Sequence, residues 1–66
     1  MPVVTIELWE GKSGEEKEML IKSVTNALVE SLKVKEEWVQ IIIHDAPMEN
    51  WGVGGKQASK MMHGKK

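Results

Sequence analysis

The sequence predicts a single long helix to cover two apolar strands, and this small number of helices limits how the chain can fold. Residues 3–9 alternate between an apolar face and a mixed one, which predicts a strand. A second strand is predicted over residues 38–45, where three isoleucines at 41–43 indicate burial on both faces. Between the strands, apolar residues recur at spacings of three and four from Leu20 to Leu32, which predicts an amphipathic helix.

Turn and capping residues place the start of this helix. Gly11 and Gly14 break the first strand. Ser13 stands three residues before Glu16, the spacing of a capping box, in which each side chain accepts a hydrogen bond from the other residue's backbone N–H. We therefore expect the helix to begin directly after Ser13 and to continue to about Leu32.

This order of elements predicts the α/β (α+β) class, with a βαβ unit whose parallel strands are joined by a right-handed crossover. Glycines at 52, 54 and 55 predict a short hairpin over residues 51–55, preceded by a loop over 46–50. One helix covers a single face of a sheet, and a two-stranded sheet is marginal in water. We therefore expect copies of the chain to associate through their sheet faces or strand edges.

The size of the chain leads to the same expectation. At 66 residues and 7.4 kDa, a compact monomer would expose about 4,200 Å² of a possible ~10,700 Å². The free energy gained by burying apolar area then roughly offsets the entropy lost in ordering the chain. Disulfides are excluded because there is no cysteine, and histidines at 44 and 63 are too few for a convincing zinc site. Assembly remains as the source of the missing stability.

Composition argues against several other classes. The chain has room for one domain, residues 1–66, in which 56–66 form a lysine-rich tail expected to be solvated or frayed. No apolar run approaches the ~20 residues that span a bilayer, and no signal-like pattern is seen, so no membrane partner is expected. A net charge of −1 argues against nucleic acid as a partner. The absence of cysteine fits a reducing compartment, and we expect a cytoplasmic protein.

Pro2 is the most informative single residue. Proline at the first position of a strand is commonly harmless, because its missing N–H costs nothing there. A Met-Pro start, however, favours removal of the initiator methionine, which would leave Pro2 with a free secondary amine. An α-amino group titrates near ~7.7–8.0, so such an amine is a general base suited to neutral pH.

Several short motifs occur in an order that resembles a known family. They are the start Pro2-Val3-Val4-Thr5-Ile6, the turn Glu10-Gly11-Lys12-Ser13, the helix start Glu16-Lys17 and the segment Trp51-Gly52-Val53-Gly54-Gly55-Lys56. Together with the βαβ pattern, these motifs look like the small 4-oxalocrotonate tautomerases of the tautomerase superfamily. The resemblance extends from Pro2 to about Ser59.

The resemblance implies a tautomerase fold, assembled as a homohexamer that is a trimer of dimers, and an isomerase without a cofactor. It implies that the processed Pro2 is the catalytic base, which moves a proton between the enol oxygen and a carbon of an unsaturated 2-hydroxy acid. The family has two arginines that assist, one after the Glu-Gly turn and one from the second strand of a neighbouring subunit, and an aromatic residue that shapes the pocket. Lys12, Gln40 and Trp51 stand at these three positions.

These positions depart from the family pattern, and the chain contains no arginine. Lys12 keeps the charge without the planar fork that grips a carboxylate in two places, and its simpler role is a solvated turn residue. Gln40 donates hydrogen bonds without charge, or is an ordinary polar residue of a strand. Trp51 keeps the pocket apolar and adds one N–H donor, or belongs to the core or an interface. We expect better activity on a monoacid than on a dicarboxylate.

Other polar and aromatic residues have simpler expected roles. Trp9 and Trp38 are expected at subunit contacts, where large aromatic residues are enriched. His44 is expected to form a hydrogen bond at a strand end. Lys35 or Lys56 is a candidate for the missing cationic partner across an interface.

Two other functions stay open. A hydratase, dehalogenase or decarboxylase on the same scaffold would need a positioned carboxylate, for which Asp45 and Glu49 are candidates. A non-catalytic oligomeric binding or scaffold subunit is favoured if Met1 is retained, because the nitrogen of Pro2 is then an amide with no basic lone pair.

Overall fold

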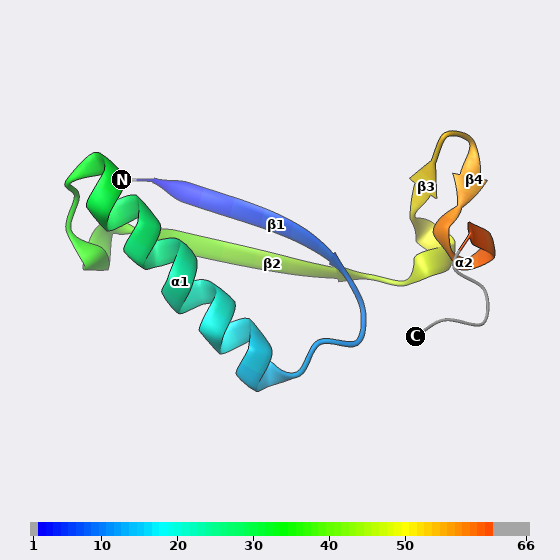
Figure 1. The fold of residues 1–66 in the computed structure, drawn as a ribbon, viewed down its shortest axis with the longest axis horizontal. Helices are drawn as coiled ribbons and strands as arrows, with labels where there is room; N and C mark the ends of the chain where they lie inside the picture. Colours follow the sequence, from blue (N-terminus) through cyan, green and yellow to red (C-terminus); the bar gives the residue numbers. More distant parts are fainter. Residues whose placement is uncertain (1, 62–66) are drawn as a thin grey trace.

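The computed structural model describes residues 2–61 and confirms the predicted βαβ unit. Figure 1 shows β1 (Val3–Trp9) and β2 (Gln40–Ala46) side by side, with α1 (Gly14–Leu32) crossing them. The two strands are parallel, with Val3 opposite Gln40 at one end and Trp9 opposite Ala46 at the other. The second strand begins two residues later than predicted, because Glu36–Trp38 form a 3-10 turn that leads into it.

The capping box predicted for α1 is present. The Ser13 hydroxyl accepts a hydrogen bond from the Glu16 N–H at 3.1 Å, and the Glu16 carboxylate accepts one from the Ser13 N–H at 2.9 Å. At the other end Lys33 adopts the left-handed conformation, with φ of 58°, and its N–H donates to the Val29 carbonyl. Both ends of the helix are therefore fixed by local hydrogen bonds.

The two faces of the β1–β2 sheet are covered unequally. Alternate residues facing α1 are half-buried, namely Val4, Ile6, Leu8, Ile41 and Ile43. On the opposite face Val3 is 55% exposed and Ile42 is 45% exposed. One copy therefore leaves part of the isoleucine run open, as expected for a sheet that a single helix covers, and burial of the run on both faces would require another copy.

The C-terminal part of the chain forms a small unit at the end of the sheet (Figure 1). It contains a 3-10 turn over Met48–Asn50, the antiparallel strands β3 (Gly52–Val53) and β4 (Lys56–Gln57), and the helix α2 (Ala58–Met61). The predicted hairpin is confirmed, and it reaches further than predicted.

Residues 56–61 are not frayed, because they form β4 and α2, although the Lys56 and Lys60 side chains are exposed as the expectation of a solvated tail requires. Ala58 is 1% exposed, and its N–H donates to the Trp51 carbonyl at 2.8 Å, which fastens α2 to the start of the hairpin. Met1 and residues 62–66, which include His63 and the rest of the lysine-rich tail, lie outside the described residues.

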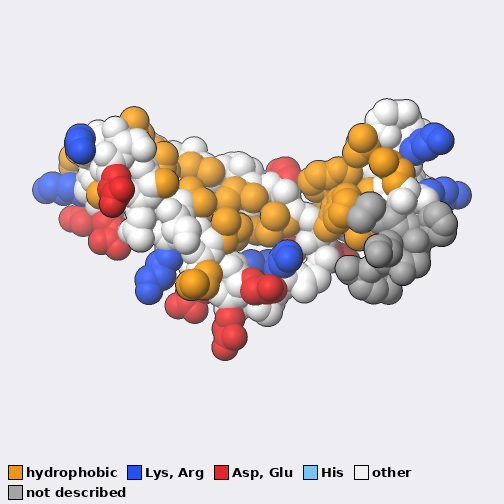
Figure 2. All heavy atoms as spheres, viewed as in Figure 1, with side chains coloured by type: hydrophobic (Ala, Val, Ile, Leu, Met, Phe, Trp, Pro, Cys, Tyr) orange, Lys and Arg blue, Asp and Glu red, His pale blue; other side chains and the backbone are white. Residues whose placement is uncertain are grey.

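A single copy exposes more surface than a compact protein of its mass. Its accessible surface is 5278 Å², against about 4,200 Å² expected for a compact monomer. Its radius of gyration is 14.9 Å, against about 11 Å expected for a compact domain of this length. Figure 2 shows hydrophobic side chains at the surface between α1 and the C-terminal unit. The shape is that of a subunit whose core is incomplete without a neighbour.

Within residues 2–61, α1 is too polar to cross a membrane and no other helix qualifies by length and apolar character.

The capping box gives the first prediction. Ser13→Ala removes the acceptor for the Glu16 N–H and is expected to lower the free energy of unfolding by about 1 kcal/mol. Helicity by circular dichroism and a denaturant titration measure the change. Thr at the same position restores a hydroxyl and is the matched control.

The same box predicts a dependence on acid. The backbone hydrogen bond from Ser13, with the nearby charge of Lys12, holds the pKa of Glu16 below its ordinary value of 4.5. A lowered pKa means that the stabilisation is present above the ordinary value and is lost as pH falls through the lowered one. Glu16→Gln should remove this dependence. A wild-type protein and a Glu16→Gln variant with equal acid sensitivity would contradict it.

Candidate functional site

Pro2 and Gln40 lie together at the beginning of the sheet. Pro2 immediately precedes β1 and is half-buried, and its carbonyl accepts a hydrogen bond from the Gln40 N–H at 3.0 Å. This bond is possible because β1 and β2 are parallel, so that both strands start at the same edge. Lys35 comes five residues before β2 at this end, and its amino group lies 5.6 Å from the centre of the Trp38 ring.

Lys12 and Trp51 lie at the opposite end of the same sheet. Lys12 follows β1 by three residues, and Trp51 contacts Trp9, the last residue of β1. A strand rises about 3.3 Å per residue, so seven residues separate the two ends by roughly 20 Å. The four predicted site residues thus form two groups that one copy of the chain does not bring together.

Because the two groups lie so far apart, a site that contains all four residues requires more than one copy of the chain. A lysine or glutamine side chain is far shorter than the distance between the two groups, so neither bridges it within one chain. A second copy placed with its sheet running in the opposite direction would bring its Lys12 and Trp51 ends towards Pro2 and Gln40. A pocket that contains all four side chains is therefore a pocket between copies.

Trp9 connects the C-terminal unit to the sheet. Its ring centre lies 5.8 Å from that of Trp51, and the two planes meet at 78°, an edge-to-face contact. The Trp9 indole N–H is buried and has no hydrogen-bond partner among residues 2–61. An unpaired buried donor costs roughly 1–3 kcal/mol, so the packing around Trp9 offsets a real penalty.

The other polar candidates are engaged elsewhere in the fold. The carboxylate of Asp45 lies 2.5 Å from the Lys17 amino group of α1, on the covered face of the sheet. Glu49 is exposed, and its backbone carbonyl, not its carboxylate, accepts a hydrogen bond from the Gln57 side chain.

His44 forms the predicted hydrogen bond, but its partner lies on the neighbouring strand. The imidazole Nδ1 is 2.9 Å from the Glu7 carboxylate, and the two residues are opposite each other in the parallel register. This pair was not predicted, because the partner depends on which residue of β1 faces His44. Aligning the two strands from Val3 and Gln40 would have found it.

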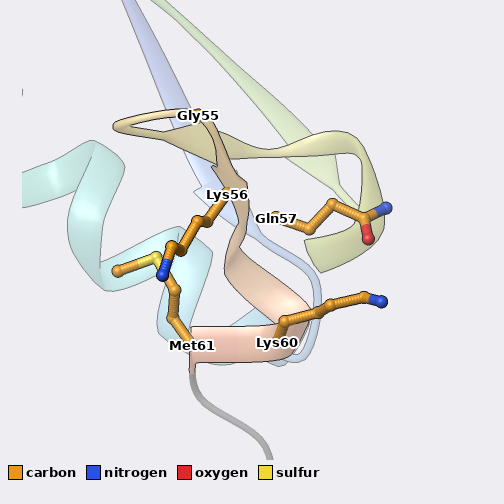
Figure 3. A pocket seen from close by; sticks show the side chains of 5 residues that line it. All are labelled: Gly55, Lys56, Gln57, Lys60 and Met61. Carbon is orange, nitrogen blue, oxygen red and sulfur yellow. The ribbon is translucent and has the colours of Figure 1, made fainter.

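A hollow of about 590 Å³ lies beside the hairpin and α2, lined by Gly55, Lys56, Gln57, Lys60 and Met61 (Figure 3). The Lys56 and Lys60 side chains extend in different directions from it (Figure 3). It includes none of Pro2, Lys12, Gln40 and Trp51, although Lys56, a candidate for the missing cationic partner, lines it. Within residues 2–61, no group of three or more histidine, aspartate or glutamate side chains is arranged to hold a metal ion.

Comparisons with known proteins agree with the fold and the motifs. A sequence model of the family described as "Tautomerase enzyme" matches residues 2–61. The 2-hydroxymuconate tautomerase of Comamonas testosteroni is 43% identical over 61 residues, which cover 92% of this chain and 97% of that protein.

Two solved structures show the same architecture. The 4-oxalocrotonate tautomerase isozymes of Methylibium petroleiphilum superpose with a TM-score of 0.88 at 30% identity, covering 91% of this chain and 94% of the other. The heterohexamer 4-oxalocrotonate tautomerase of Chloroflexus aurantiacus superposes with a TM-score of 0.87 at 30% identity, covering 92% and 98%.

The edge-to-face contact gives a prediction for this end of the sheet. Trp9→Ala removes the contact that holds Trp51 and is expected to cost at least ~1 kcal/mol of stability. Trp9→Phe keeps an aromatic edge and removes the unpaired N–H, so its cost should be smaller. Near-ultraviolet circular dichroism reports the pair, and denaturant titration reports stability. Equal losses in the two variants would contradict the role given to the ring.

Proposed function

This chain belongs to the 4-oxalocrotonate tautomerase family of the tautomerase superfamily and is an isomerase, and we propose that Pro2 is its catalytic base. The proposed reaction converts a small 2-hydroxy-dienoate or an arylenolpyruvate into the 2-oxo form. The observation that supports it best is the position of Pro2, half-buried at the head of β1 beside Gln40.

The proposed base acts through the amine that removal of Met1 leaves on Pro2. Such an amine titrates near ~7.7–8.0, so a useful fraction is unprotonated at neutral pH. It takes the proton of the substrate 2-hydroxyl, and the electron pair forms the carbonyl while the double bonds shift. The resulting ammonium returns a proton to a carbon of the substrate, so the amine is restored and no group is consumed. The ring holds the nitrogen in one orientation throughout.

The negative charge that develops on the substrate needs fixed donors. Gln40 is bonded to Pro2 of the same chain through its backbone N–H. In the proposed assembly a neighbouring copy supplies the Gln40 side chain of the pocket, as the family resemblance implies, and Lys12 also comes from another copy. Gln40 supplies hydrogen bonds and Lys12 supplies one positive charge, which together suit a single carboxylate and the developing enolate oxygen. A dicarboxylate would place its second negative charge where this pair has no second cation.

The proposed pocket is completed by an apolar wall and by assembly. Trp51, held by the edge of Trp9, offers an aromatic surface for a planar dienoate or aryl group. Because the two groups of site residues lie at opposite ends of one sheet, we propose a homo-oligomer, as a hexamer built from dimers. The heterohexamer among the related structures supports an assembly of this size.

The structure gives a reason to rank the hydratase, dehalogenase or decarboxylase alternative lower. These reactions would use a positioned carboxylate, and that of Asp45 is paired with Lys17 under α1. The scaffold alternative depends on Met1, which lies outside the described residues. An intact mass of the purified chain distinguishes it, because a retained methionine leaves no amine on Pro2.

The base is tested by Pro2→Ala. The variant keeps an amine after processing but loses the fixed ring, so kcat/KM is expected to fall on the order of 10²-fold. Ketonisation of 2-hydroxymuconate and phenylenolpyruvate is followed by ultraviolet absorbance, with intact mass confirming processing. The carbonyl that accepts from Gln40 is retained, so the assembly state should not change and serves as the control. An undiminished rate would reject Pro2 as the base.

Substrate preference is tested by Gln40→Arg. The substitution adds a charged fork at the neutral position and is expected to raise kcat/KM for a dicarboxylate by about 10- to 100-fold, and less for a monoacid. Gln40→Lys is the matched control for charge without the fork. Equal effects on both substrates would contradict the proposed division of roles.

A further inference from the structure

The face of the β1–β2 sheet opposite α1 carries a charged pair at its centre. Along this face the paired residues run from Val3 and Gln40, through Thr5 and Ile42, to Glu7 and His44. The Glu7 carboxylate and the His44 imidazole are 2.9 Å apart and are each more than half exposed in one copy. Trp9 and Ala46 complete this face, so the two opposite, titratable groups lie among apolar and neutral residues.

The uncovered surface of one copy is large enough for a contact with another copy. A single copy exposes 5278 Å², about 1,100 Å² beyond the ~4,200 Å² of a compact chain. A standard protein interface buries about 800 Å² per partner. The excess is therefore enough for contact with another copy. A symmetric contact uses the same surface patch of both copies, so the Glu7–His44 pairs of both copies enter it.

Other charged groups could also influence the Glu7–His44 pair, so their positions in the fold matter. Glu7 and His44 are the titratable side chains at the strand positions of this face. On the other face, Lys17 of α1 is paired with Asp45. Among residues 2–61, α1 and its C-cap also carry Glu15, Glu16, Glu18, Lys22, Glu30 and Lys33. The other charged groups belong to the segments at the two ends of the strands: the proposed Pro2 amine with Lys35, Glu36 and Glu37 at one end, and Glu10, Lys12, Glu49, Lys56 and Lys60 at the other.

We propose that this face binds a second copy of the chain and that the Glu7–His44 pair makes the association stronger in mild acid than in mild base. The inference rests on the proposed oligomer and goes beyond it by giving the interface a dependence on protons. It does not involve Pro2, Lys12 or Trp51.

The direction of the pH dependence follows from the charges that the contact would bury. With the imidazole protonated, the pair is neutral overall, and each charge has an opposite neighbour. When the imidazole loses its proton, each copy brings an unbalanced carboxylate into the contact, where like charges repel and desolvation disfavours them. Histidine side chains change charge between about pH 5 and 8. Association should therefore take up protons and weaken as pH rises through this range.

Sedimentation velocity over a dilution series of the full chain, at about pH 5.5 and about pH 8, measures the effect. Each proton taken up changes the association constant by up to about tenfold per pH unit. We expect the wild type to dissociate at higher concentrations in base than in acid. His44→Gln should abolish the difference, and Glu7→Gln should reverse it, because it leaves an unpaired imidazolium in acid.

The chain offers a matched control in His63, its other histidine. His63→Gln should keep the wild-type pH dependence. A dependence that survives in His44→Gln, or that disappears in His63→Gln, would overturn the inference. Circular dichroism confirms that each variant is folded before it is compared.

The face itself is tested separately from the pair. Ile42 is 45% exposed on this face, and Met19 is 66% exposed on α1. Ile42→Lys should dissociate the assembly at every pH, whereas Met19→Lys should not. An assembly that tolerates Ile42→Lys would reject this face as the contact.

Activity measured on the same samples keeps the two proposals distinguishable. An active oligomer without pH-linked association would reject the inference and leave the reaction standing. A pH-linked but inactive oligomer would do the reverse. A chain that is monomeric under every condition would reject both the assembly and the inference.

Discussion

The hydrogen bond from the Gln40 N–H to the Pro2 carbonyl, at 3.0 Å, forms the first rung of a parallel ladder that ends at Trp9 and Ala46. A parallel pair needs a long crossover, and here the crossover is α1, which then lies on one face of the sheet. The same register places Pro2 beside Gln40 and sends Lys12 and Trp51 to the far end. The covered face of the sheet, its open face and the division of the predicted site into two groups all follow from the parallel pairing of β1 with β2.

The incomplete core and the incomplete site have the same cause. A chain with one long helix leaves one sheet face uncovered, and a parallel sheet of seven-residue strands keeps its two ends far apart. Another copy that covers exposed apolar surface would also bring a second set of strand ends. In such a subunit, stability and substrate binding depend on the same contacts, so selection on either acts on the interface.

Much of this arrangement could be predicted from the sequence, because the signals are local. The period of apolar residues located β1 and α1, and the Ser13–Glu16 spacing located the start of the helix. The 3-10 turn over Glu36–Trp38 was not predicted, because Trp38 and Val39 are both residue types that favour strands and so do not mark where β2 begins. The order of residues 56–61 was not predicted because four lysines suggest solvation, whereas Ala58 is fixed by a distant carbonyl at Trp51. The Glu7–His44 pair depends on register, which no single segment encodes.

The substitutions at the two arginine positions separate two parts of the proposed chemistry. In the proposed reaction, moving a proton between oxygen and carbon requires an amine of suitable basicity in a fixed place, and the proposed Pro2 amine would meet that need without any cation. Holding the substrate requires charge and hydrogen bonds that match its anionic groups, and there Lys12 and Gln40 provide less than two arginines would. Trp51, whose ring centre lies 5.8 Å from that of Trp9, adds an aromatic surface to the proposed pocket. A site with less charge and more aromatic surface favours a substrate with one carboxylate and one apolar end, and it does so without altering the base.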